Sequence, residues 1–378
     1  MEGWHPVAAA GLGALLLFGI AGFVLVLLLW FDNPKVDPSW ALPVFATAIA
    51  AGGAAGLTMK NLNLKRAESR RDTNLMFDSQ FETGARLLGG DSESEIIAGS
   101  LLLGSLLRES PRHAQACADL LCASLRKKLP GDLEPDEEDS LIAQDPPGMR
   151  EAMAEATRIR NSITRAVAHG LRKADGPAHL ATLRWRFDDA VFGDEVDFET
   201  CIFGPGTRFA RAVFSGDVSF WGASFGDSVR FSDVYAPRGL FMRGVKVSGA
   251  VEVENGRFGK PGQEGSYGVF LMGAHIKGLW IEHLVTAGDI DYDGGEAIGD
   301  IEIAHVQCRS VFVNGVRCHG RVELHSVDSL GDFGLKDLTI RKTLDVNNCK
   351  GRALEIRNVA AEGGVSHADN QFETEVHE

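Results

Sequence analysis

The sequence predicts an α+β multidomain chain with two transmembrane helices, a small helical segment and a right-handed β-helix. Three observations predict it: two long uncharged runs near the start, helical periodicity after them, and an apolar pattern that recurs about every eleven residues through the second half. A short, fixed period of this kind is typical of a solenoid, in which each unit buries its apolar face by stacking on its neighbours.

The two uncharged runs, 7–30 and 40–59, are each long enough to cross a bilayer as a helix, and a polar turn joins them. They predict a transmembrane hairpin over residues 1–60, with the lipid bilayer as a partner. Gly52 and Gly56 give a small-x-x-x-small face on which the two spans would pack. The positive-inside rule then predicts a multi-pass cell-membrane protein with both termini cytoplasmic, because the second run is followed by a basic cluster. The cluster comprises Lys60, Lys65, Arg66, Arg70 and Arg71.

Amphipathic periodicity predicts helices over 61–130, arranged as an armadillo-like or HEAT-like pair after a longer helix. Ser92 with Glu95 three residues later predicts a capping box at one helix start. Ser110, followed by proline, predicts the N-cap of the next helix. Residues 131–180 are predicted as an acidic linker and a connecting helix.

The repeats occupy 181–361, as about sixteen units interrupted by a Gly- and Pro-rich insertion at 259–267. Apolar residues two apart point to the same side of an extended chain, and the polar corners between the pieces favour a β-helix with two units per turn. Residues 362–378 are predicted as an acidic tail. Equivalent positions of consecutive units are expected to form one buried stack of Phe198, Phe209, Phe220 and Phe231.

Segments 190–194, 212–216 and 223–227 place a small residue two before a central Phe, and in this they resemble the pentapeptide-repeat family. The helical stretch before the repeats is similar to that of membrane-anchored bacterial members. The repeat departs from the strict five-residue form by one extra residue, and beyond Val251 only a generic β-helix is matched. The resemblance implies a quadrilateral β-helix that serves as an interaction surface, usually without enzymatic activity.

The chain has a formal net charge of -14, most of it in the repeat half. Such a surface repels phosphate backbones, so the sequence predicts no nucleic-acid partner. Its 6 cysteines form no C-x-x-C motif and fall mostly on apolar positions, which predicts reduced, buried thiols.

Two features are candidates for a partner surface. Glu302, Glu323 and Asp345 occupy equivalent positions of neighbouring turns, where like charges repel and a cation or a basic partner would be favoured. A solvated acidic stripe is the alternative interpretation. Tyr267, in the insertion, is the expected anchor of a contact through that loop.

Catalytic and metal-binding patterns are weak. His283 and His305 should stack on adjacent turns, but no third ligand is evident. The acidic segment 289–296 lacks the twelfth-position Glu of an EF-hand loop. No P-loop, nucleophile elbow or H-E-x-x-H motif is present, so we expect no catalytic residue, cofactor or metal.

The sequence therefore predicts a non-enzymatic, membrane-tethered scaffold whose solenoid binds a cytoplasmic protein, with self-association as a further option. Two alternatives stay open at this point. One is an acidic solenoid that mimics DNA towards a topoisomerase, and the other is a β-helix enzyme acting on carbohydrate.

Overall fold

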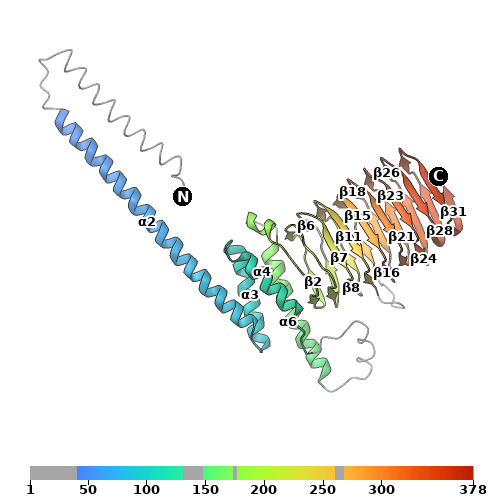
Figure 1. The fold of residues 1–378 in the computed structure, drawn as a ribbon, viewed down its shortest axis with the longest axis horizontal. Coiled ribbons are helices and arrows are strands. Elements are labelled where there is room, and N and C mark those ends of the chain that lie inside the picture. The colour runs from blue at the N-terminus through green and yellow to red at the C-terminus, as the bar shows by residue number, and fades with distance from the viewer. Residues whose placement is uncertain (1–40, 131–147, 173–176, 260–267, 378) are drawn as a thin grey trace, which may run out of the picture. The chain divides into compact units, whose positions relative to one another are not determined.

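A computed structural model describes residues 41–130, 148–172, 177–259 and 268–377 (Figure 1). The chain divides into two units, Met1–Met76 and Phe77–Glu378. Each unit is described by itself below.

Helix α2 (Ala41–Leu88) corrects the membrane prediction. Of the two expected spans, 7–30 lies outside the described residues, while the part of 40–59 that is described, with Gly52 and Gly56, belongs to this helix. Nowhere in the described part of the chain is a helix both long enough and apolar enough to cross a bilayer. For the part of the chain that the structure describes, the prediction of two transmembrane helices is therefore wrong, and so is the multi-pass localisation with cytoplasmic termini drawn from it. A bilayer as partner stays a prediction.

The physical reason lies in the composition and length of α2. Its uncharged part is rich in Ala and Gly, which are less hydrophobic than Leu, Ile, Val or Phe. The helix has 48 residues in all and continues without a break through the basic cluster that starts at Lys60. An uncharged run rich in Ala and Gly is a weaker indication of a membrane span than one filled by large apolar side chains.

The second unit begins with a helical part, whose core is formed by residues such as Leu103, Leu121 and Ile163. Its elements are α3 (Glu93–Glu109), α4 (Ala114–Arg126), α6 (Met149–Leu171) and the 3-10 helix η2 (Ala178–Thr182).

The capping predictions for these helices have different outcomes. The Ser92 hydroxyl caps α3 as predicted, because it accepts a hydrogen bond from the Glu95 backbone N–H at 3.3 Å. Ser110, however, ends α3 rather than capping α4, which begins only at Ala114.

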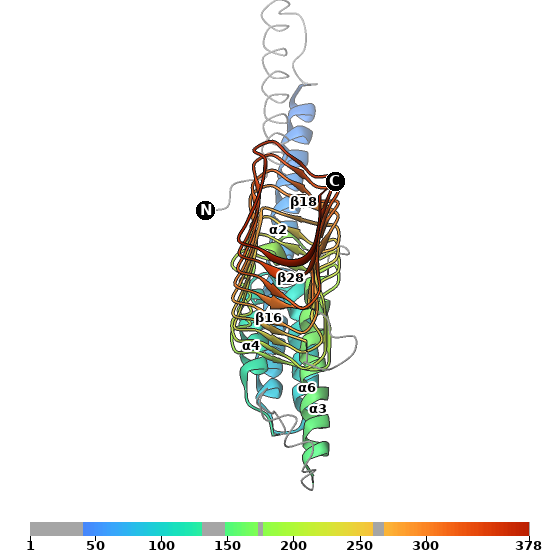
Figure 2. The ribbon, with the colours of Figure 1, turned by 90° about the vertical axis from the view of Figure 1, so that its right-hand side faces the viewer.

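The rest of the unit is a parallel β-solenoid, as predicted (Figure 1). Seen from its end, the coils superimpose in an elongated four-sided outline (Figure 2). One sheet of 16 strands follows two sides of this outline and joins them through β28, and the other two sides hold sheets of 8 and 7 strands. Since each turn contributes one strand to the 8-stranded sheet, the solenoid has about eight turns.

The strands of the three sheets, in spatial order, are as follows. The 16-stranded sheet contains β1 (Val191–Phe192), β4 (Val213–Phe214), β8 (Tyr235–Ala236), β12 (Arg257–Phe258), β16 (Val285–Thr286), β20 (Gln307–Cys308), β24 (Asp328–Ser329), β28 (Lys350–Arg357), β25 (Asp332–Lys336), β21 (Val311–Asn314), β17 (Ile290–Asp293), β13 (Val269–Phe270), β9 (Leu240–Phe241), β5 (Asp217–Ser219) and β2 (Glu195–Asp197), with β31 (Gln371–His377) beside β28. The 8-stranded sheet contains β29 (Ala360–Ala361), β26 (Thr339–Ile340), β22 (Arg317–Cys318), β18 (Gly295–Ala297), β14 (Ala274–Ile276), β10 (Lys246–Val247), β6 (Ser224–Phe225) and β3 (Ile202–Phe203). The 7-stranded sheet contains β30 (Val365–Ala368), β27 (Leu344–Asn347), β23 (Val322–His325), β19 (Ile301–Ala304), β15 (Gly278–Glu282), β11 (Ala250–Glu254) and β7 (Val229–Ser232).

The phenylalanine positions predicted as one stack are all buried, but they form two ladders that face each other across the core. Phe198 stacks on Phe220 at 5.4 Å, and Phe209 stacks on Phe231 at 5.0 Å. Rings of the two ladders meet edge to face, as between Phe209 and Phe220 at 5.6 Å. Consecutive units lie half a turn apart, so alternate units share a ladder.

Many of the corners between strands are polar residues in the left-handed region, with φ between 51° and 60°. Asn and Asp tolerate this region because their short side chains bond locally. Corners of this kind occur at Asp189, Thr200, Arg211, Asp233, Asn255, His283, His305, Ser326, Asp337, Asn348, Asn358 and Asp369.

Helix α6 covers the edge of the first coil. Asn161 donates to Asp194 at 2.6 Å and Arg165 pairs with Glu195 at 2.6 Å. Gly193 permits this close approach, because a Cβ there would lie 2.0 Å from the Asn161 Oδ1 atom. The cap satisfies an edge that would otherwise expose unpaired strand groups.

Two further expectations concern segments around the coils. Residues 260–267, with Tyr267, lie outside the described residues, while the flanking strands β12 and β13 stay in register with their neighbours. The expected acidic tail, 362–378, instead forms β30 and β31, which add a further coil up to His377.

The cysteines are buried and unpaired, in agreement with the predicted buried thiols. Burial raises the pKa of the Cys201 and Cys308 thiols to about 12. The thiolate, which is the nucleophile and metal ligand, is therefore disfavoured at these sites.

Candidate functional site

The outward face of the 7-stranded sheet carries the three carboxylates that the sequence singled out. Glu302 on β19, Glu323 on β23 and Asp345 on β27 are direct neighbours in register, so the predicted alignment is confirmed. The register extends the same line to Trp280 on β15 and Glu252 on β11. We call these five residues the acidic column.

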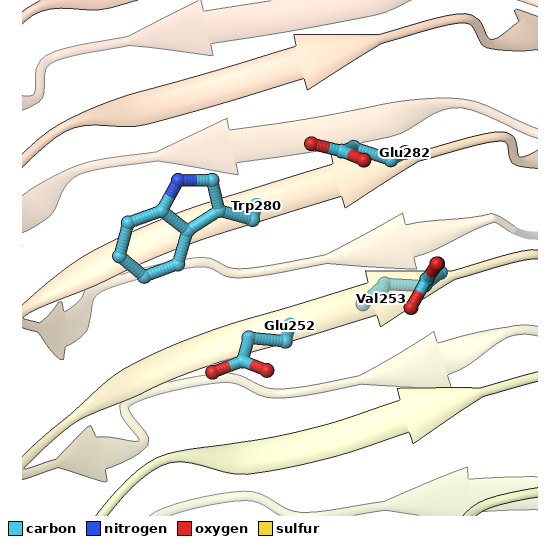
Figure 3. A pocket seen from close by; sticks show the side chains of 5 residues that line it. Glu252, Val253, Trp280 and Glu282 are labelled. Atoms are coloured by element: carbon cyan, nitrogen blue, oxygen red, sulfur yellow. The ribbon is translucent and has the colours of Figure 1, made fainter.

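A second outward line runs beside the column, where Glu254 on β11 lies directly opposite Glu282 on β15. The two lines enclose an open depression of about 340 Å³, shown in Figure 3. We call this depression the Trp280 hollow; it is lined by Glu252, Val253, Glu254, Trp280 and Glu282.

The indole of Trp280 forms the apolar floor of the hollow. It lies over Gly278, two residues earlier on the same strand, because a Cβ at that glycine would be only 2.8 Å from the Trp280 Cη2 atom. The absence of a side chain at Gly278 therefore lets the ring lie along the sheet. The side chain stays 36% exposed, which leaves an aromatic surface available to a partner.

Each of the four carboxylates of the acidic column has a polar partner. Glu302 faces His325 at 3.5 Å, Glu323 lies 3.7 Å from Arg321, and Glu252 pairs with Arg230. Asp345 accepts a hydrogen bond from the Thr343 hydroxyl at 2.6 Å.

Glu254 and Glu282 differ, because no described residue forms an ion pair with either of them. They face each other on neighbouring strands, and like charges so placed repel. The Trp280 hollow therefore combines uncompensated negative charge with an aromatic face. That combination suits a cation, since ammonium and guanidinium groups are attracted to both.

The sequence predicted the alignment of Glu302, Glu323 and Asp345, but it did not predict the Trp280 hollow. Residues stacked on one face were expected about twenty-two apart, and Trp280 and Glu302 follow that rule. Glu252 and Trp280 are twenty-eight apart, because the insertion lies between their strands. A search for residues about twenty-two apart therefore does not find the pair of Glu252 and Trp280.

The other candidate residues do not assemble into a site. His283 and His305 stack as predicted, with ring centroids 5.0 Å apart, but in the described chain they belong to no group of three close ligand atoms. Asp289 is held by Arg309, and Asp293 and Glu296 lie on different sheets. The acidic segment therefore does not converge on one point.

Asp291 is exceptional within that segment, because it stands between two aromatic residues on the outer face of the 16-stranded sheet. Its neighbours in register are Phe270 and Phe312, and its Oδ1 atom is buried without a hydrogen-bond partner. Burial, with a smaller contribution from the charges of Asp293 and Asp289, raises the pKa of the Asp291 carboxyl to about 6.

We expect Asp291→Asn to stabilise the chain at neutral pH. The folded-state pKa of about 6 exceeds the ordinary 3.8, so the cost of ionising Asp291 is absent below the lower value and fully present above the higher one. Allowing for the half-exposed side chain, the gain at pH 7.5 is about 1 kcal/mol. Urea melts at pH 4 and 7.5 measure it. A gain of equal size at both pH values would contradict the argument.

No family model, curated protein or solved structure matches this chain. The fold and the geometry of the acidic face therefore carry the functional argument.

Proposed function

We propose that this protein is a non-enzymatic interaction scaffold whose solenoid binds a basic segment of a partner protein. The observation that carries the proposal is the Trp280 hollow, where an exposed indole lies among three carboxylates. A lysine or arginine side chain of the partner would lie over the indole, with Glu254 and Glu282 as its counter-ions.

The acidic column favours an extended basic segment as the partner over a single cationic group. Its members follow one another on successive strands, which lie about 4.8 Å apart. A basic segment lying across these strands would meet a carboxylate at nearly every step beyond the hollow. The face is built on a continuous stack of paired strands, as in solenoids that present extended binding surfaces.

The likeness of the first coils to pentapeptide repeats supports the same class of function. The proposal leaves out a membrane tether, and it names no nucleic acid as partner, because the negative face repels phosphates. Self-association through the acidic face would require a basic surface on the second copy.

The test uses the full chain and a fluorescent octalysine peptide, with octaglutamate as the charge control. We expect Trp280→Ala and the double variant Glu254→Gln/Glu282→Gln each to weaken octalysine binding by about tenfold. Trp221→Ala is the matched control, because Trp221 is 51% exposed but has the Arg243 guanidinium over its ring at 5.2 Å. This control variant should bind as the unaltered chain does.

Two results would count against the proposal. Octalysine could bind the Trp280 and Trp221 variants equally well, which would place any binding elsewhere. Alternatively, octalysine affinity could fall with salt but not respond to Trp280→Ala, which would reduce the hollow to a diffuse acidic surface.

One observation favours a second function, that of an enzyme acting on carbohydrate. Glycoside hydrolases also use a pair of carboxyl groups for catalysis, and the hollow places such a pair beside an aromatic ring. The hollow offers only one ring, on an open sheet face, so we place this function second. Release of reducing sugar from a polysaccharide panel, lost in Glu282→Gln, would reverse the order.

A further inference from the structure

Three core columns of the solenoid change their chemistry in the last coil that the structure describes. Inward positions that are aliphatic or aromatic in the preceding turns are occupied there by two histidines and a glutamate. The columns run through Ile303, Leu324, Val346 and His367; through Val311, Phe333, Leu354 and Glu375; and through Val313, Leu335, Ile356 and His377.

These three side chains meet. One potential ligand atom from each of His367, Glu375 and His377 lies within 4.8 Å of the other two. The two imidazole rings are 4.7 Å apart at their centroids, and the His377 Nε2 atom is 3.6 Å from the Glu375 Oε2 atom. Strand β30 supplies one ligand and β31 the other two, so the cluster joins two sides of the coil.

Exposure of the last described coil to solvent does not by itself account for these residues. Other inward positions of the same coil keep apolar residues: Val365 follows Leu344 in its column, and Phe372 packs edge-on against Phe333 at 5.0 Å. A fourth inward position also turns polar, where Asn370 follows Cys349, but its amide is used by the backbone: it donates to the Val346 carbonyl at 2.8 Å and accepts from the Cys349 N–H at 2.9 Å. The three remaining polar positions converge, and all three carry metal-ligating side chains. Solvation alone does not explain that convergence.

We propose that His367, Glu375 and His377 bind a zinc ion. Zinc takes imidazole nitrogen and carboxylate oxygen in tetrahedral sites, and two histidines with one glutamate leave a fourth position for water. The stacked rings need only rotate about χ2, a broad torsion in histidine, to aim their lone pairs at a common point. Hard cations such as magnesium and calcium prefer all-oxygen sites and do not fit this set.

The ion would fasten β30 to β31 and so close the last described coil. A metal that binds the folded state alone stabilises it by mass action. The site is independent of the Trp280 hollow, which lies on the outer face of the same solenoid. Failure of the interaction proposal would therefore leave this one intact, and the reverse also holds.

The experiment titrates zinc chloride into the metal-free full chain by isothermal calorimetry, with cobalt(II) as a spectroscopic substitute. We expect one zinc per chain, a visible absorption band typical of tetrahedral cobalt, and a higher melting temperature with zinc. His367→Ala, His377→Ala and Glu375→Gln should each weaken zinc binding by at least about tenfold and remove the thermal shift.

The matched control is the double variant His283→Ala/His305→Ala, which removes the other stacked imidazole pair but leaves the three proposed ligands. It should bind zinc as the unaltered chain does, and magnesium or calcium should not replace zinc. Melting each variant without metal establishes that it folds, and Glu375→Gln is the mildest change if a histidine variant does not. Absence of zinc binding, or binding lost in the control but kept in His367→Ala and His377→Ala, would overturn the proposal.

Discussion

Replacing Phe220 by alanine is expected to lower the free energy of unfolding by about 3–5 kcal/mol. The ring is fully buried and contacts both facing ladders, since it stacks on Phe198 in its own ladder at 5.4 Å and meets Phe231 of the other ladder edge-on at 5.8 Å. Truncation removes the buried apolar area and leaves a cavity that ring neighbours on rigid strands cannot fill. A solenoid unit depends on its neighbours, so the loss reaches the adjacent coils as well.

Chemical denaturation of the full chain, followed by far-UV circular dichroism, measures this loss. Phe312→Ala is the control, because Phe312 lies on the outside of the solenoid and is only partly buried. Its truncation should cost about 1 kcal/mol, in proportion to the smaller area removed from water. Equal losses in the two variants would show that Phe220 is not the inward residue of its strand.

Replacing Arg160 by methionine is expected to cost about 2–4 kcal/mol. Arg160 is 1% exposed on α6, and its guanidinium donates to the carbonyl oxygens of Leu125 and Lys127, the latter at 2.7 Å. These carbonyls lie at the end of α4, where the helix leaves its last acceptors unsatisfied and favours a cation. Methionine fills the space but has no hydrogen-bond donor, so the carbonyl oxygens of Leu125 and Lys127 lose the hydrogen bonds that Arg160 gives them.

Arg158→Met provides the comparison on the same helix. Arg158 is 55% exposed and pairs with Glu93 at 2.7 Å, a surface pair whose contribution is about 0–1 kcal/mol. Thermal and urea melts of both variants in parallel give the difference. If the Arg160 variant were as stable as the Arg158 variant, the helical part would not depend on this buried capping interaction.

The periodicity of the sequence predicts correctly which residues point inward wherever the repeat units before and after a residue have the same apolar pattern. The inward residues from Trp185 to Ile356 follow from the spacing of the repeats, and so does the alignment of Glu302 with Glu323. The cap at Ser92 follows from residue type alone. These features depend on interactions between near neighbours in sequence or between identical units, which a single sequence displays.

Other features depend on contacts that the sequence does not display. The second uncharged run predicts a membrane span, because its hydropathy does not show that the same helix continues into charged residues. The sequence predicts an acidic tail over 362–378, because the repeat pattern does not continue there, whereas the structure pairs β30 with β27 and β31 with β28.

The sequence by itself determined that the second half stacks as a β-helix, because apolar residues two and three apart, interrupted by glycine, give no helical stripe and can be buried only when one unit stacks on the next. Only the tertiary structure decided which outward residues become neighbours. An insertion of a few residues between two strands shifts the spacing along the chain but leaves the spacing between strands unchanged, since backbone hydrogen bonds fix the latter. For that reason Glu252 stands beside Trp280, and the hollow between them exists only in the folded chain.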